Sequence, residues 1–191
     1  MRYNISNDPN YEEKVGGLYL NIRQEEASDY TEVYELVKVS FATASHWDGT
    51  EADYLNDVRK KDTFIPELSL VTEDENGKII GQIVLYKTNI TMSDKTVTEL
   101  VLSPICVHPN YFRRGIARSL MEQAFGIAKK MKYTAVFLCG EPEIYCKIGF
   151  VPTYKKNIFH IADTEGSAEW CMVREIIDGA LTDVSGTINI L

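Results

Sequence analysis

The residues of this 191-residue sequence best suited to chemistry are three arginines that lie close together. Arg113, Arg114 and Arg118 place three of the 20 Lys and Arg side chains within six residues, where uniform scatter would place about 0.6. Guanidinium groups pair well with phosphate oxygens, so the cluster predicts an anion site. The rest of the chain is acidic, with 28 Asp and Glu residues and a net charge of −8. Such a field repels nucleic acid and anionic membranes, so neither partner is predicted.

The arginines fall where a predicted strand meets a predicted helix. Residues 96–107 form a β-branched and apolar run, residues 114–131 carry apolar side chains at helical spacing, and residues 135–139 form a short buried strand. In such a β-α-β crossover, a ligand sits between the end of the first strand and the start of the helix. Gly115 and Ala117 leave the first helical turn open to a phosphate. The sequence therefore predicts a diphosphate site, and a solvated loop with surface arginines is the alternative.

The remaining patterns predict an α/β fold. Its mixed sheet is mostly antiparallel, with one parallel β-α-β crossover and helices packed on it. Asp29 with Glu32, and Thr50, are predicted to cap two helices. Pro66 is predicted to break the chain before a strand, and residues 152–167 to form a long loop. Strands are predicted at 18–22, 68–72, 79–86, 96–107, 135–139, 169–174 and 185–190, and helices at 30–41, 51–61, 114–131 and 142–147.

Length and cysteine pattern limit the classes of protein further. One domain is expected over residues 18–191, after an N-terminal arm of residues 1–17. The four cysteines, at 106, 139, 146 and 171, show no C-x-x-C pair and no His at zinc spacing, so reduced thiols and no metal site are predicted. No signal peptide or membrane-spanning run is visible, which predicts a cytoplasmic protein without a membrane partner.

The arginine-containing segment resembles motif A of the GNAT superfamily of acetyl-CoA-dependent N-acetyltransferases. The residues from Ile105 to Leu120 read ICVHPNYFRRGIARSL. The family pattern is an apolar residue, Val and Pro at the strand end, followed by [Q/R]-x-x-G-x-[G/A] at the helix start. About thirty residues later, the run from Tyr145 to Phe150, YCKIGF, resembles the second signature of the family. The resemblance covers the chain from about residue 18 to residue 190.

Two further details refine the resemblance. The residues Gly140-Glu141-Pro142 and the two late strands are similar to a branch of small bacterial members of undefined substrate. The position three before Gly115, usually Gln or Arg, is Phe112 here. Phe112 cannot make the side-chain contact to a diphosphate that the family residue makes, and Arg113 or Arg114 is the candidate substitute.

The resemblance implies that acetyl-CoA is the co-substrate and that no metal is needed. The pantetheine arm would hydrogen-bond the main chain of Ile105 and Val107, with Cys106 between them. The acceptor would be a small-molecule or peptide amine that attacks the thioester directly in a ternary complex. The implied contacts of the diphosphate region are Phe112, Arg113, Arg114, Gly115, Ile116, Ala117, Arg118 and Ser119.

The implied reaction leaves two proton transfers for side chains. The amine must lose a proton, and the leaving thiolate must gain one. Tyr145 matches the family tyrosine that donates to the leaving sulfur, and an aromatic that only packs is the alternative. Glu99, on the strand leading to motif A, is the candidate base, against a solvated carboxylate at a strand start. An acetyl-cysteine on Cys106 or Cys146 is not favoured, because no His is placed to activate it.

Other functions remain open from the sequence. A catalytically weak or inactive acyl-CoA-binding protein of the same fold is the main alternative, because Phe112 departs from the family pattern. Nucleic-acid binding fits poorly, since the arginines lie in a small-residue turn and the chain is acidic. Edge strands predicted near the C-terminus leave room for a homodimer.

Overall fold

The computed structural model describes residues 11–15, 17–43 and 48–190. The chain divides into two compact units. Unit 1 contains the residues up to 85 together with 103–127, and unit 2 contains 86–102 together with 128 to the C-terminus. Strands β4 (Ile79–Thr91) and β5 (Thr96–Val107) and helix α3 (Ile116–Lys130) each contribute residues to both units.

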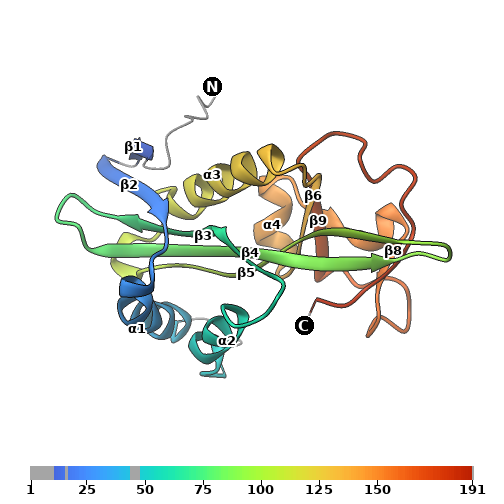
Figure 1. The fold of residues 1–191 in the computed structure, drawn as a ribbon, viewed down its shortest axis with the longest axis horizontal. Coiled ribbons are helices and arrows are strands. Elements are labelled where there is room, and N and C mark those ends of the chain that lie inside the picture. The colour runs from blue at the N-terminus through green and yellow to red at the C-terminus, as the bar shows by residue number, and fades with distance from the viewer. Residues whose placement is uncertain (1–10, 16, 44–47, 191) are drawn as a thin grey trace. The chain divides into compact units, whose positions relative to one another are not determined.

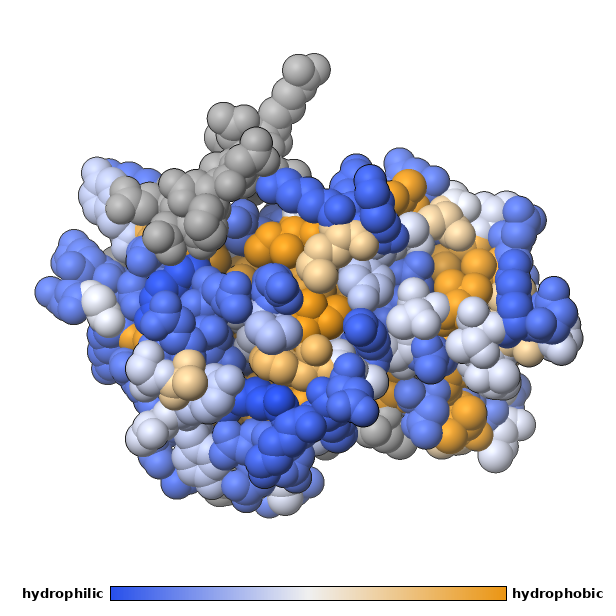
Figure 2. Space-filling view, viewed as in Figure 1, coloured by the Kyte–Doolittle hydropathy of each residue, from blue (hydrophilic) through white to orange (hydrophobic). Residues whose placement is uncertain are grey.

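Unit 1 is a sheet with helices on both faces. Its strand order is β1-β2-β3-β4-β5, and the β1–β2 and β2–β3 pairs are antiparallel. In Figure 1, α1 and α2 lie below these strands, and α3 lies above them. On the face shown in Figure 2, hydrophilic side chains cover the outer surface of α1 and α2. The elements not yet bounded are β1 (Tyr11–Val15), β2 (Leu18–Gln24), β3 (Phe64–Glu73), α1 (Tyr30–Phe41) and α2 (Glu51–Val58).

The helices of unit 1 bury the faces that apolar periodicity predicts. Val33 and Val37 of α1 are fully buried, as are Leu55 and Val58 of α2. On α3, Leu120 is buried at the predicted helical spacing. The predicted helices over 30–41 and 114–131 are therefore confirmed, each to within two residues.

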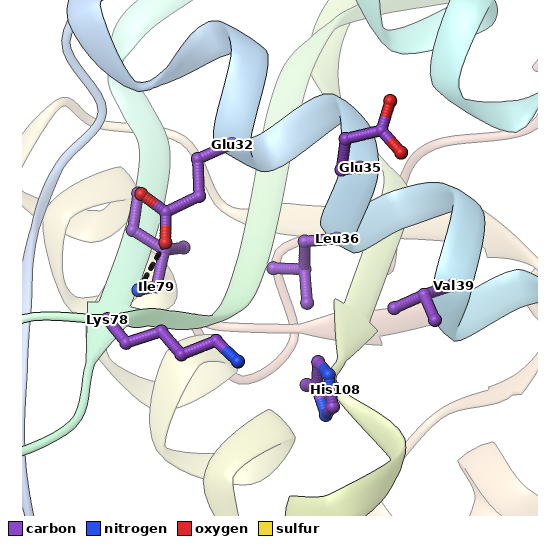
Figure 3. Close-up of a pocket in the computed structure, with 7 residues that line it drawn as sticks. All are labelled: Glu32, Glu35, Leu36, Val39, Lys78, Ile79 and His108. Carbon is purple, nitrogen blue, oxygen red and sulfur yellow. Dashed lines mark hydrogen bonds between the residues drawn. The ribbon is translucent and has the colours of Figure 1, made fainter.

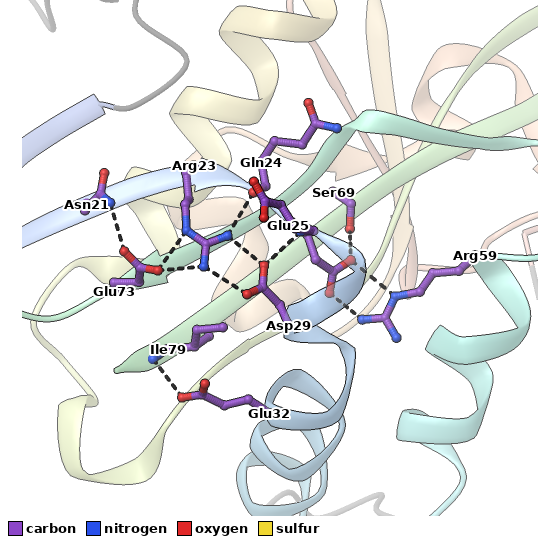
Figure 4. A network of polar contacts seen from close by, with 11 residues as sticks. Asn21, Arg23, Gln24, Glu25, Asp29, Glu32, Arg59, Ser69, Glu73 and Ile79 are labelled. Atoms are coloured by element: carbon purple, nitrogen blue, oxygen red, sulfur yellow. Dashed lines mark hydrogen bonds and ion pairs between the residues drawn. The ribbon is translucent and has the colours of Figure 1, made fainter. Parts of the chain in front are cut away.

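A network of charged side chains joins β2, β3, α1 and α2 within unit 1 (Figure 4). Glu25, just after β2, forms an ion pair with Arg59 at the end of α2, and both side chains are buried. Arg23 of β2 pairs with Asp29 before α1 at 2.6 Å and with Glu73 of β3 at 2.6 Å. These contacts fix the two helices against the strands.

Unit 2 contains the parallel strand pair of the predicted crossover. β5 pairs in parallel with β6 (Ala135–Cys139), Leu100 lying opposite Val136, and α3 connects the two strands along the chain. The strand order is β4-β5-β6-β9-β7, and β9 (Cys171–Glu175) is antiparallel to both β6 and β7 (Val151–Pro152). The predicted mixed, mostly antiparallel α/β fold is confirmed. A second parallel pair, not predicted, joins β10 (Gly186–Ile188) to β8 (Ile158–His160).

Asp29 and Thr50 occupy the predicted N-cap positions of α1 and α2, but neither side chain makes the predicted capping hydrogen bond. The Asp29 carboxylate is held by the ion pair described above. Glu32 Oε1 accepts a hydrogen bond from the Ile79 N–H at 3.0 Å, so it serves the start of β4 instead of its own helix. The Thr50 hydroxyl donates to Asp48 at 2.6 Å. Each of these side chains is thus engaged elsewhere: Asp29 by a guanidinium, Glu32 by a strand N–H and Thr50 by a neighbouring carboxylate. None of them bonds the N–H groups at the start of its own helix.

Three segment boundaries also differ from the prediction. Pro66 lies inside β3, because the strand begins at Phe64, two residues before it. The Pro66 side chain is exposed. The predicted loop 152–167 contains the end of β7, a 3-10 turn at Thr153–Lys156 and β8. Of the predicted arm, residues 1–10 and 16 lie outside the described residues, and Tyr11–Val15 pairs as an edge strand.

Candidate functional site

The loop between β5 and α3 is anchored to the turn between β3 and β4. The His108 N–H donates to the Ile80 carbonyl at 2.8 Å as β5 ends. A 3-10 turn, Pro109–Tyr111, follows, and the Tyr111 hydroxyl donates to Asp74 Oδ2 at 2.9 Å. Asp74 Oδ1 also accepts the N–H of Lys78 in its own turn. No sequence pattern indicated Tyr111 or Asp74, because their contact joins residues 37 positions apart.

Two residues of this loop have the left-handed backbone that occurs in anion nests. Arg113 and Gly115 both have positive φ, 61° and 86°, and Arg114 between them does not. Left-handed residues in such a turn make successive N–H groups converge on one side, where an anion can accept from them. Gly115 adopts this backbone without the strain that a Cβ would cause. The Ser119 N–H donates to the Gly115 carbonyl at 3.0 Å, so the first turn of α3 begins directly after this loop.

The side chains around this turn add positive charge. Arg113, Arg114 and Arg118 are exposed, and the Arg114 guanidinium lies 5.6 Å from the centre of the Tyr111 ring. Phe112 is 47% exposed. N–H groups, the positive end of the α3 dipole and these guanidinium groups suit a diphosphate. The predicted residues Ile105 to Ser119 thus lie on one strand end, one loop and one helix start of unit 1.

The strand end carries a buried thiol. Cys106 is buried, and burial raises the pKa of its thiol to about 12. At neutral pH the group therefore remains a thiol, which is a poor nucleophile. Val107 is also buried, and Ile105 is half-buried.

A pocket of about 300 Å³ adjoins the same strand end in unit 1 (Figure 3). Burial and the Lys78 ammonium both lower the pKa of His108, so its ring in this pocket is neutral at pH 7. His108 Nδ1 accepts the Asn110 N–H at 3.3 Å. The sequence analysis did not predict this pocket, which needs α1 to lie beside β4. Its lining residues are Glu32, Glu35, Leu36, Val39, Lys78, Ile79 and His108.

Tyr145 belongs to unit 2, in the short helix α4 (Pro142–Tyr145). Its ring lies edge-on to Phe150, 5.7 Å between centres, and directly over Gly140, where a Cβ would come within 2.4 Å of the ring. Burial, with the Glu141 charge adding, raises the pKa of Tyr145, so the phenol keeps its proton at neutral pH. Among the described residues, none hydrogen-bonds the Tyr145 hydroxyl.

Glu99, also in unit 2, is a buried carboxylate and not a solvated one. It is 4% exposed. Its oxygens accept hydrogen bonds from the N–H of Thr134 at 2.9 Å, the hydroxyl of Thr134 and the N–H of Ala135 at 3.0 Å. These contacts tie β5 to the start of β6 and leave the carboxylate engaged.

Two negative findings apply to the described part of the chain. No three His, Cys, Asp or Glu side chains there are grouped to hold a metal ion. In the same residues, no helix is both long and apolar enough to cross a membrane.

Comparison with known proteins identifies a matching family. A family model described as an acetyltransferase (GNAT) domain matches residues 21–153, which include the β5–α3 loop and Tyr145. No curated protein sequence matches this chain.

Solved structures of the same fold cover most of the chain. A GNAT family N-acetyltransferase (YhbS) from Escherichia coli, in complex with CoA, is 24% identical with a TM-score of 0.78, over 91% of both chains. A GNAT family acetyltransferase from Brucella melitensis, in complex with acetyl-CoA, is 18% identical with a TM-score of 0.70, over 90% of this chain and 96% of that one. The ribosomal-protein-S18-alanine N-acetyltransferase from Escherichia coli is 18% identical with a TM-score of 0.55, over 83% and 94%.

Proposed function

Because the chain belongs to the GNAT acetyltransferase family, we propose that it moves an acetyl group from acetyl-CoA to a primary amine by direct attack in a ternary complex. The observation that carries the proposal is the β5–α3 loop, whose left-handed residues and exposed arginines suit a diphosphate. Similar structures contain CoA or acetyl-CoA, which supports the same ligand here. Acetyl-CoA supplies an acyl group activated as a thioester.

The chain's own residues divide into those that bind and those that move protons. The N–H groups of residues 115–118 would hold the diphosphate, and the main chain of Ile105 and Val107 would hold the pantetheine arm. Phe112 carries no charge, so Arg113 and Arg114 supply the side-chain charge of this loop. These contacts orient the thioester for the acceptor amine.

Tyr145 is the proposed general acid for the leaving thiolate. A thiolate with an ordinary pKa of about 8.5 must gain a proton, and the raised pKa of Tyr145 keeps a proton available on the phenol. Glu99 remains only a sequence prediction for the base, and its three hydrogen bonds support a structural role. Direct attack is favoured over an acyl-cysteine because Cys106 is buried as a thiol.

The proposal is tested by release of CoA thiol with a panel of primary amines. Initial rates at varied concentrations of both substrates should give intersecting double-reciprocal lines, as a ternary complex requires. Replacing both Arg113 and Arg114 by Ala should raise the KM for acetyl-CoA about tenfold or more, because charge-assisted hydrogen bonds are lost. The matched control replaces Lys129 and Lys130, exposed at the other end of α3, and removes the same charge. A KM equally raised in the control would overturn the diphosphate assignment.

Tyr145→Phe tests the general acid. It should lower kcat about a hundredfold and leave CoA binding unchanged, since only the hydroxyl is removed. An unchanged kcat and pH profile would remove the assignment.

The second candidate function is acyl-CoA binding without turnover, which Phe112 in place of a polar residue favours. Binding of CoA by titration calorimetry, lost with the two arginines but without thiol release for any amine, would establish this alternative.

A further inference from the structure

Two cysteines of unit 2 lie opposite each other on neighbouring strands. Cys139 ends β6 and Cys171 begins β9, and the antiparallel register pairs them directly. The next pair of the ladder joins the Gly140 N–H to the Trp170 carbonyl at 2.8 Å. Hydrogen-bonded and non-hydrogen-bonded pairs alternate, so the cysteines form a non-hydrogen-bonded pair, with Cα atoms about 4.5 Å apart and close side chains. Disulfides span Cα distances of about 4.4 to 6.8 Å, so this position suits one.

The environments of the two thiols differ in a way that favours oxidation of the pair. Both cysteines are free, Cys139 exposed and Cys171 buried. The Cys139 thiol donates a hydrogen bond to the Ile190 carbonyl at 3.9 Å. The interaction between the two sulfurs lowers the pKa of Cys171 and raises the pKa of Cys139, so the proton of the pair stays on Cys139. Cys139 is thus the cysteine that peroxide can reach from solvent, and Cys171 is the neighbour placed to attack the oxidised sulfur in a second step.

We propose that Cys139 and Cys171 form a reversible disulfide under peroxide, which makes the β6–β9 strand end an oxidation site of this protein. The Cys139 thiol releases its proton to solvent, its sulfur attacks a peroxide oxygen and the O–O bond breaks, and the departing hydroxide takes up a proton, so that a sulfenic acid and one water form. The Cys171 thiolate then attacks the Cys139 sulfur, the S–S bond forms, and the hydroxyl leaves as a second water. In total, two thiols lose two electrons and two protons, and one hydrogen peroxide is reduced to two waters.

The site lies at the start of the segment that carries Tyr145. Gly140 follows Cys139 directly, and its Cα packs against the Tyr145 ring. A bond between Cys139 and Cys171 thus links β9 to the strand end from which α4 departs. Neither Cys106, which is buried in unit 1, nor the exposed Cys146 has a cysteine as its register partner in the described strands.

The experiment uses the full chain carrying Cys146→Ser, which removes the other exposed thiol. The protein is treated with hydrogen peroxide, denatured, alkylated with N-ethylmaleimide and analysed by mass spectrometry. The number of alkylated cysteines should fall from three to one, the mass should fall by two hydrogens before alkylation, and dithiothreitol should restore all three. The disulfide should form about tenfold faster or more in the folded protein than in urea, because the fold holds the sulfurs together.

Cys139→Ser in the same background is the matched variant, since an exposed position tolerates this change. It should leave both remaining cysteines alkylatable after peroxide. The proposal is overturned if Cys139 is oxidised while Cys171 still alkylates, or if the pair forms no faster in the folded protein than in urea.

Discussion

The two units each bury a glutamate, and they compensate its charge in different ways. In unit 1, Glu25 pairs with the Arg59 guanidinium and accepts the Ser69 hydroxyl at 2.7 Å. In unit 2, Glu99 pairs with no cation among the described residues and accepts hydrogen bonds from Thr134 and Ala135. A buried carboxylate thus needs either one full charge or several oriented N–H and O–H dipoles. The first arrangement fails when one side chain is removed, whereas most donors of the second belong to the main chain.

The largest expected effect is therefore in unit 1, at Arg59. Arg59→Met removes the cation and leaves the Glu25 carboxylate buried without it. We expect the free energy of unfolding to fall by about 3 to 5 kcal/mol, as for other broken buried pairs. Urea unfolding followed by circular dichroism measures this loss.

The neighbouring Lys60 provides the control for Arg59. Its ion pair with Asp57 is exposed on both sides, so Lys60→Met should change the unfolding free energy by less than about 0.5 kcal/mol. The double variant Glu25→Gln with Arg59→Met should recover part of the loss, because no charge stays buried. Equal stability of Arg59→Met and Lys60→Met would refute the comparison.

An intermediate effect is expected in unit 2, for Glu99→Gln. The amide keeps the shape but turns an NH2 group toward an N–H donor, so we expect a loss of about 1 to 3 kcal/mol in the free energy of unfolding. Glu67→Gln, an exposed carboxylate in β3, is the control and should be neutral. If Glu99 only links β5 to β6, the pH dependence of kcat stays unchanged. If the limb of the kcat–pH profile near neutral pH is lost in Glu99→Gln, Glu99 is instead the general base.

The crossover and the Glu99 site differ in how far the sequence predicts them. The crossover from β5 through α3 to β6 was predictable, because its signals are local: a β-branched run, helical spacing and Gly115 at the turn. Gly115 permits the positive φ that the turn requires, whereas the positive φ of Arg113 has no such signal in the sequence. Two of the three partners of Glu99 are main-chain N–H groups 35 and 36 residues away, which almost any residue supplies, so no side-chain pattern announces them.

Long-range contacts also account for the errors in the fold. The pairing of β8 with β10 joins residues 28 positions apart and leaves no local mark. β4 extends to Thr91, beyond the predicted end at residue 86. In this extension exposed and buried side chains alternate: Lys87, Asn89 and Thr91 are exposed, and Thr88 and Ile90 are buried. That alternation is the signal of a half-exposed strand, and a prediction based on apolar content alone stops too early.

A smaller effect is expected for Asp29, at the edge of the unit 1 network. The Arg23 guanidinium lowers the pKa of Asp29 below its usual 3.8. The folded state therefore gains stability above the unfolded pKa, and this gain is lost as pH falls through the lowered value. We expect about 1 kcal/mol to be lost below pH 4 or so. Thermal unfolding of the wild type and Asp29→Asn between pH 7 and pH 3 measures it. Identical pH profiles for the two proteins would contradict the prediction.

The smallest effect is expected at Gln82 of β4, a buried polar group that lacks both kinds of compensation. Its side chain is fully buried, and neither its amide nitrogen nor its amide oxygen has a partner among the described residues. Gln82→Met keeps the length and removes a desolvated amide, so the free energy of unfolding should stay within about 1 kcal/mol of the wild type or rise. Gln24→Met, at an exposed position of β2, controls for the change of residue. A loss of more than about 1 kcal/mol relative to that control would show that Gln82 is compensated after all, by an ordered water. Gln82 would then be hydrogen-bonded like Glu25 and Glu99, and would differ from them only in the kind of group that bonds it.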